Sequence, residues 1–184
     1  MTEKTTPPPV PRPVLKHWDQ LRINYVKATP RQRLGPIVSR VMDPLHWGPN
    51  LLITGISAVE AFARCLVVEA RARIERRPKV EVYEEVRDSN AVELVLQCLA
   101  QRKAGTPGQV FGAERWRSFC QAVNKYRHVV LHECTYLNGA KLEELNRACR
   151  EVLVLLIELA GYKERFDRLV AEARHAYQDA RAAL

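Results

Sequence analysis

The feature that most constrains the fold is a repeated spacing of apolar residues by three and four positions, found in several long segments. In residues 51–77 the apolar residues that share one helical face are Leu52, Ile56, Val59, Ala63, Leu66, Ala70 and Ile74. No run of β-branched residues alternates with polar residues between turn signals, as strands would require. The spacing therefore predicts an all-α protein, and 184 residues are enough to bury a core in one domain.

Proline and glycine divide this pattern into segments. We expect helices over residues 15–28, 31–42, 51–77, 80–103, 113–135, 142–159 and from 162 onward. The turn-rich stretch AGTPGQVFG (104–112) is expected to be a loop, and Gly161 to cap the helix before it. Three regions follow: a disordered Pro-rich tail (1–14), a short helical N-terminal extension (15–50), and an up-and-down four- or five-helix bundle (51–184).

The charge is positive and unevenly distributed. The chain carries a formal net charge of +8, and residues 1–50 hold eight basic against three acidic side chains. A basic N-terminal region favours an anionic partner such as a nucleic-acid backbone, although a charge of this size can also serve solubility alone.

The cysteines and the N-terminus indicate the compartment. Five cysteines are widely spaced without a CxxC pair, which favours free thiols in a reducing cytoplasm over a zinc or disulfide site. No apolar signal segment opens the chain, and the longest apolar run, VLVLLI at 152–157, is too short to span a membrane. We expect a cytoplasmic protein without membrane contact.

The segment NKYRHVVLHEC (124–134) carries the residues best suited to chemistry. The core face of its helix is expected to be formed by Trp116, Phe119, Val123, Tyr126 and Val130. At 100° per residue, His128 and His132 both point away from that face, about 40° apart. They are either ordinary surface histidines or metal ligands joined by Glu133 or Cys134. Because no third ligand with suitable spacing occurs elsewhere, we expect neither a metal nor a cofactor.

A third interpretation rests on Arg127. The stretch RHVVLH (127–132) resembles the R-x4-6-H signature of the HEPN superfamily of helical-bundle ribonucleases, in whose shorter form Asn, His or Gln follows the Arg. Its position is also similar, near the end of a core helix, after a long first pair of helices and before another helix. The resemblance covers about residues 51–161, and the first 50 residues have no counterpart in it.

The resemblance implies a metal-independent endoribonuclease that acts on RNA and leaves 2′,3′-cyclic phosphate ends. His132 would be the general acid or base, since a histidine pKa near neutrality suits proton transfer at the 2′-OH and the 5′-oxygen. Arg127 would neutralise charge on the phosphate, and His128 would support it by hydrogen bonding. Glu60 would orient Arg127 or instead pair with Arg64 four residues along its helix.

Two features complicate a site within one chain. Glu133 follows His132 where many HEPN members have a small residue, which alters the local charge. On a regular helix Arg127 and His132 point about 140° apart, so the motif needs a distorted helix end, a long reach by Arg127 or a second subunit. HEPN proteins commonly form homodimers whose two motifs line one cleft, and the resemblance implies a homodimer here.

Two classes of function remain open at this point. One is a HEPN ribonuclease in a toxin–antitoxin or phage-defence role, with an antitoxin or regulatory protein as a further partner. The other is a non-catalytic HEPN-like module that serves as a scaffold or transcriptional regulator. A DNA-binding helical protein is a third interpretation, but the sequence has no persuasive helix-turn-helix spacing.

Overall fold

The computed structural model describes residues 17–43, 48–132 and 137–182, and for residues 17–19, 131, 132, 177 and 179–182 it describes the backbone alone. The described residues form helices and connecting segments without a strand, which confirms the all-α prediction. The elements are α1 (His17–Lys27), α2 (Pro30–Val41), α3 (Pro49–Glu75), α4 (Lys79–Val86), α5 (Ala91–Arg102), α6 (Pro107–Phe111), α7 (Ala113–Gln121), η1 (Ala122–Tyr126), α8 (Arg127–His132), α9 (Gly139–Leu159) and α10 (Lys163–Ala182). The expected Pro-rich tail lies outside the described residues.

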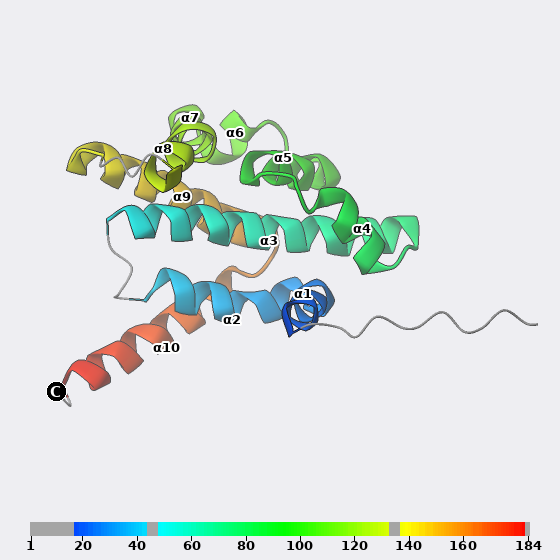
Figure 1. The fold of residues 1–184 in the computed structure, drawn as a ribbon, viewed down its shortest axis with the longest axis horizontal. Helices are drawn as coiled ribbons and strands as arrows, with labels where there is room; N and C mark the ends of the chain where they lie inside the picture. Colours follow the sequence, from blue (N-terminus) through cyan, green and yellow to red (C-terminus); the bar gives the residue numbers. More distant parts are fainter. Residues whose placement is uncertain (1–16, 44–47, 133–136, 183–184) are drawn as a thin grey trace, which may run out of the picture.

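Helix α3 runs through the middle of the bundle, and the other helices are arranged around it. In Figure 1, α5, α7 and α8 lie on one side of α3, and α1, α2 and α10 lie on the other. α5, α9 and α2 pack directly on α3, while α7 packs on α9 and α10 packs on α2. The two N-terminal helices are therefore part of the same packed body.

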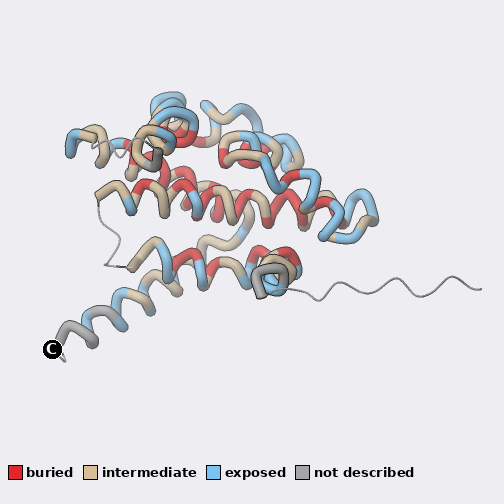
Figure 2. The backbone as a smooth tube through the Cα atoms, viewed as in Figure 1, coloured by how far each residue is buried: buried red, intermediate tan, exposed pale blue. Residues whose placement is uncertain are grey.

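The predicted apolar face of α3 forms the centre of the core. Leu52, Ile56 and Val59 are fully buried, and burial continues along most of the helix (Figure 2). The predicted apolar face is not buried at the end of the helix, where Ile74 in the last turn is 69% exposed. A Cβ atom added at Gly55 would lie 3.2 Å from Cβ of Cys149, so α3 and α9 approach closely at this glycine.

Helix α9 is buried on more than one side at its apolar centre. Within the segment 152–157, the buried side chains are Val152, Leu153, Leu156 and Ile157. They lie where α9 packs against both α3 and α7, so helices of this chain cover the segment. At the end of α9, Gly161 adopts a φ of +81° and the N–H of Tyr162 reaches back to the carbonyl of Ile157, which confirms the predicted glycine cap.

The expected helix over residues 80–103 is wrong, because the chain breaks it into α4 and α5. Asn90 caps α5, with its side chain accepting from the N–H groups of Val92 and Glu93, and Glu93 returns a bond to the N–H of Asn90. This capping box starts a new helix with its own direction. Leu96, which a continuous helix would have placed in the core, is consequently 43% exposed.

The stretch 104–112 is also more ordered than the expected loop. Thr106 and Gln109 form a second capping box, and Pro107 occupies the first helical position, so one helical turn, α6, forms here. Its last residue, Phe111, is fully buried and stacks on Trp116 with ring centroids 5.5 Å apart.

The described cysteines are free thiols, as expected. Cys65, Cys98 and Cys149 are buried and Cys120 is partly buried, whereas Cys134 lies outside the described residues. Burial raises the pKa of Cys65 to about 11 and the pKa values of Cys98 and Cys149 to about 12. These three side chains therefore remain protonated and unreactive near neutral pH.

By length and composition, α3 is apolar enough to cross a membrane, although polar residues interrupt its sequence. Within the described residues, 67% of its most apolar window is buried inside the fold. A core helix meets the same criterion, so the observation is weak support for a membrane span.

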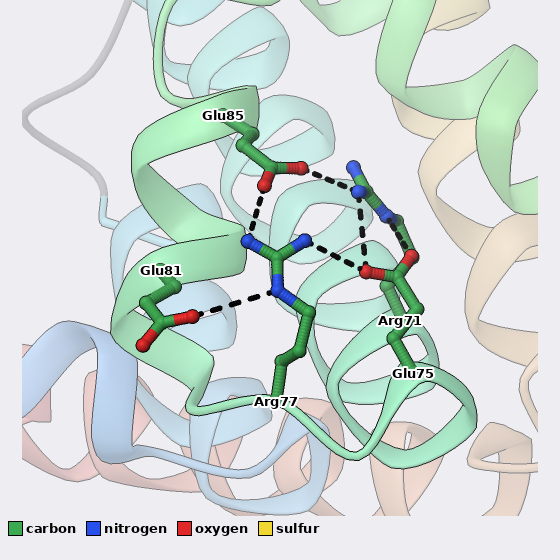
Figure 3. Close-up of polar contacts among 5 residues, drawn as sticks. All are labelled: Arg71, Glu75, Arg77, Glu81 and Glu85. Atoms are coloured by element: carbon green, nitrogen blue, oxygen red, sulfur yellow. Dashed lines mark hydrogen bonds and ion pairs between the residues drawn. The ribbon is translucent and has the colours of Figure 1, made fainter.

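A ring of charged side chains joins the end of α3 to α4 (Figure 3). Glu75 accepts from Arg71 at 2.7 Å and from Arg77 at 3.0 Å, and Glu85 accepts from both arginines at 2.5 Å. Glu81 adds a longer contact of 3.5 Å to Arg77. Hydrogen bonds, mainly from Arg71 to Glu75 and from Arg77 to Glu85, hold the pKa values of both carboxyls below their usual range.

This ring predicts a pH-dependent contribution to stability. A carboxyl whose pKa is lowered in the folded state stabilises the fold above its unfolded pKa, and the contribution is lost as the pH falls through the folded pKa. We expect the double variant Glu75→Gln/Glu85→Gln to melt below the wild type at neutral pH, with a difference that shrinks in acid. Thermal melts across the pH range test this. The exposed Glu172→Gln on α10 is the control, and a pH-independent difference would contradict the prediction.

Candidate active site around Arg127

A π-helical turn directly precedes Arg127. Residues 122–126 form η1, in which the N–H of Arg127 bonds to the carbonyl of Ala122, five residues back. Such turns hold one extra residue inside an otherwise α-helical segment and often occur at functional sites. After the extra residue, each side chain is turned back by roughly 100° relative to a continuous α-helix. Arg127 thus takes about the direction expected for its neighbour Tyr126, which was predicted to face the core.

Arg127 consequently reaches α3. Its Nη1 atom donates to Oε2 of Glu60 at 3.2 Å, and the side chain is 39% exposed. The other carboxylate oxygen of Glu60 accepts from Nη2 of Arg64 at 2.8 Å. Both contacts proposed for Glu60 are present, so this carboxylate bridges two arginines rather than choosing between them.

Arg64 extends the same set of contacts toward the turn between α4 and α5. It donates to the carbonyls of Ser89 at 3.0 Å and Val86 at 3.4 Å. Burial works to lower the Arg64 pKa, but the hydrogen bond and charge of Glu60 outweigh it, so the pKa is raised. Only 11% of the Arg64 side chain and 20% of the Glu60 side chain are exposed, so the pair anchors Arg127 from within the bundle.

The remaining motif residues are placed less completely. His128 is exposed on α8. His132 is the last residue of α8, and its side chain lies outside the described part of the chain, as do Glu133 and Cys134. Because η1 precedes both Arg127 and His132, it rotates the two residues together. The angle between their directions on α8 stays roughly 140°.

The described residues offer no alternative centre for a metal. No group of three or more His, Cys, Asp or Glu side chains within the described ranges lies close enough to hold an ion. Of the other zinc ligands considered from the sequence, His132 is described by its backbone alone, and Glu133 and Cys134 lie outside those ranges.

Two lysines beside the motif were not singled out from the sequence. The Nζ atoms of Lys125 and Lys141 lie 5.7 and 5.6 Å from the ring centroid of Tyr126, the residue before Arg127. Lys141 also lines an open groove of about 710 Å³ between α7 and α9, together with Arg117, Ser118 and Arg147. Lys141 lies in a separate helix, so only the tertiary structure brings it to the motif.

Comparison with known proteins gives no relative. No protein-family model, curated protein or solved structure matches the chain. The residues around Arg127 are therefore the main indication of function.

The contacts of Glu60 predict unequal effects of mutation on stability. We expect Glu60→Gln to lower the free energy of unfolding by about 1–2 kcal/mol, because it leaves the mostly buried Arg64 without its charged partner. Arg127→Ala should cost less than about 1 kcal/mol, because its ion pair is more exposed. Urea unfolding followed by circular dichroism measures both.

Double-mutant cycles separate the two pairs. The coupling energy between Glu60 and Arg64 should exceed that between Glu60 and Arg127. Equal couplings would mean that Arg127 is as firmly bound to Glu60 as Arg64 is.

Proposed function

We propose that the protein is a metal-independent endoribonuclease of HEPN type, which cleaves RNA in the cytoplasm in a toxin–antitoxin or phage-defence role. The support is the resemblance of residues 127–132 to the HEPN motif, the helical bundle that carries it, and the net charge of +8. An antitoxin or regulatory protein is the further partner that such a role implies.

The observation that carries the proposal is the way in which Arg127 is held. Glu60 engages one of its terminal nitrogens, Nη1, and among the described residues no partner is bound to Nε or Nη2. A guanidinium fixed at one corner retains two donors in the geometry that suits a phosphate. Lys125, beside Tyr126, adds positive charge next to this position, whereas the ammonium of Lys141 there is paired with Glu144 at 2.9 Å.

The chemistry then follows from the residue types. Arg127 stabilises the charge that grows on the phosphoryl oxygens as the 2′-OH attacks. His132 transfers the proton, either from the 2′-OH or to the leaving 5′-oxygen. His128 supports the phosphate or the base by hydrogen bonding. The products are a 2′,3′-cyclic phosphate and a free 5′-OH.

A second copy of the chain supplies what one helix cannot. Arg127 and His132 diverge by about 140° on α8, so one phosphate is contacted most directly by Arg127 of one protomer and His132 of its partner. A two-fold arrangement provides this pairing twice.

The Glu60–Arg127 ion pair also favours a second candidate. An arginine neutralised by a carboxylate can serve only to attach α8 to α3, and the bundle is then a non-catalytic HEPN-like module that acts as a scaffold or regulator. The two functions differ in whether RNA is cleaved.

The cleavage assay distinguishes them. We expect His132→Ala and Arg127→Ala to reduce cleavage of single-stranded RNA by about a hundredfold to ten-thousandfold, the usual loss when a positioned proton donor or charge stabiliser is removed. His128→Ala should have a smaller effect. The assay is run in chelator, and products are analysed for 2′,3′-cyclic phosphate ends.

Matched controls come from α10. His175→Ala and Arg174→Ala remove the same residue types at exposed positions and should cleave like the wild type. If wild type and His132→Ala are equally inactive on varied RNAs, the result supports the non-catalytic module over the ribonuclease.

Assembly gives an independent prediction. Light scattering should find about twice the chain mass of 21.1 kDa at micromolar concentration, with an interface of at least about 1,000 Å². Mixing Arg127→Ala chains with His132→Ala chains should restore part of the activity, because one mixed pair then keeps both side chains. A monomer of full activity would refute the shared site.

A further inference from the structure

A second concave surface lies between α10 and α2. These two helices lie on the opposite side of α3 from α8 (Figure 1). Its volume is about 500 Å³, within the range of small-molecule sites. Most of its side chains are basic: the lining includes Arg31, Tyr162, Lys163, Glu164, Arg165 and Arg168. We refer to it as the α10 hollow.

The three arginines of this hollow have no acidic partner among the described residues. Within the described residues, no carboxylate lies at ion-pair distance from Arg31, Arg165 or Arg168, whereas Lys163 is paired with Asp167 at 2.5 Å. Arg71 and Arg77, by contrast, each contact at least two carboxylates (Figure 3). Four basic side chains and one carboxylate, that of Glu164, line the hollow, so its net charge is positive. The like charges repel one another, and a bound anion relieves that repulsion.

Arg165, which lines the hollow, has one donor that is removed from water. Nε of Arg165 is buried and has no hydrogen-bond partner among the described residues. A buried donor without a partner lowers stability, and an oxyanion that bridges the guanidinium edge would satisfy it.

The backbone at the start of α10 also favours a negatively charged ligand. The hollow includes the first turn of α10, a 20-residue helix whose N-terminal N–H groups carry a partial positive charge. Tyr162 precedes this helix, and a phenol is not one of the short side chains that cap helix starts. Arg31, in the first turn of α2, faces the same hollow.

From these observations we propose that the α10 hollow binds a ligand carrying two or more phosphate groups. Several guanidinium forks suit such a ligand better than a single carboxylate, because each fork can contact a separate phosphate oxygen pair. The phosphates belong either to a free polyphosphate or nucleotide, or to successive positions of an RNA strand. The inference does not depend on Arg127 or on ribonuclease activity.

The test uses inorganic pyrophosphate and a labelled single-stranded RNA as separate probes of the full-length protein. Calorimetry measures binding of pyrophosphate, and fluorescence anisotropy measures binding of RNA. We expect Arg165→Gln and Arg168→Gln each to weaken binding by at least about tenfold, since each removes charge-assisted hydrogen bonds to phosphate. Circular dichroism spectra and melting temperatures verify that the variants are folded.

Arg174→Gln is the matched control, because it removes one charge from the same helix outside the hollow. It should leave the Kd within about twofold, since an exposed and more distant charge is largely screened. Arg127→Ala should leave pyrophosphate binding unchanged, which separates this site from the proposed active site.

Each result is decisive. Pyrophosphate binding that depends on Arg165 and Arg168 supports a free polyphosphate ligand. RNA binding that depends on them, without pyrophosphate binding, supports an RNA strand. Absence of binding by both probes at millimolar concentration, or equal weakening by Arg174→Gln, overturns the proposal.

Discussion

The structure depends on burial of α3 along nearly its whole length. Leu52, Ile56 and Val59 are removed from water by helices that come from both ends of the chain, so α3 is the surface on which the others assemble. The same burial fixes the position of Glu60. Its carboxylate lies on a helix that cannot move without disturbing the core. Glu60 therefore offers a fixed partner to arginine, a side chain with many rotamers.

The sequence predicted those parts of the fold that follow from a constant helical period. The helical face of α3 and the glycine cap at Gly161 were predicted correctly, because apolar spacing and a glycine cap are local properties. The prediction failed where a polar cap overrides periodicity, as at Asn90, whose capping box ends one helix and begins another. Leu96, on the helix that begins there, is 43% exposed.

For the candidate site, the sequence identified the partners but not the geometry. The contacts of Glu60 with Arg64 and Arg127 were both foreseen as alternatives, since each needs only an acid and a base on neighbouring faces. The π-turn was not foreseen, because assigning 100° to every residue leaves no place for an extra one. Lys141 was missed because its approach to Tyr126 is decided by how α9 packs on α7.

The π-turn before Arg127 determines which way α8 faces. If residues 122–126 formed a regular α-helix with none of them removed, everything after them would be rotated by roughly 100°. All the motif side chains would survive, yet the guanidinium would no longer meet Glu60. Deleting one of these five residues would instead restore an ordinary α-helix and leave the direction of α8 unchanged. A related chain with a one-residue gap in this segment would therefore keep Arg127 facing Glu60 without the π-turn.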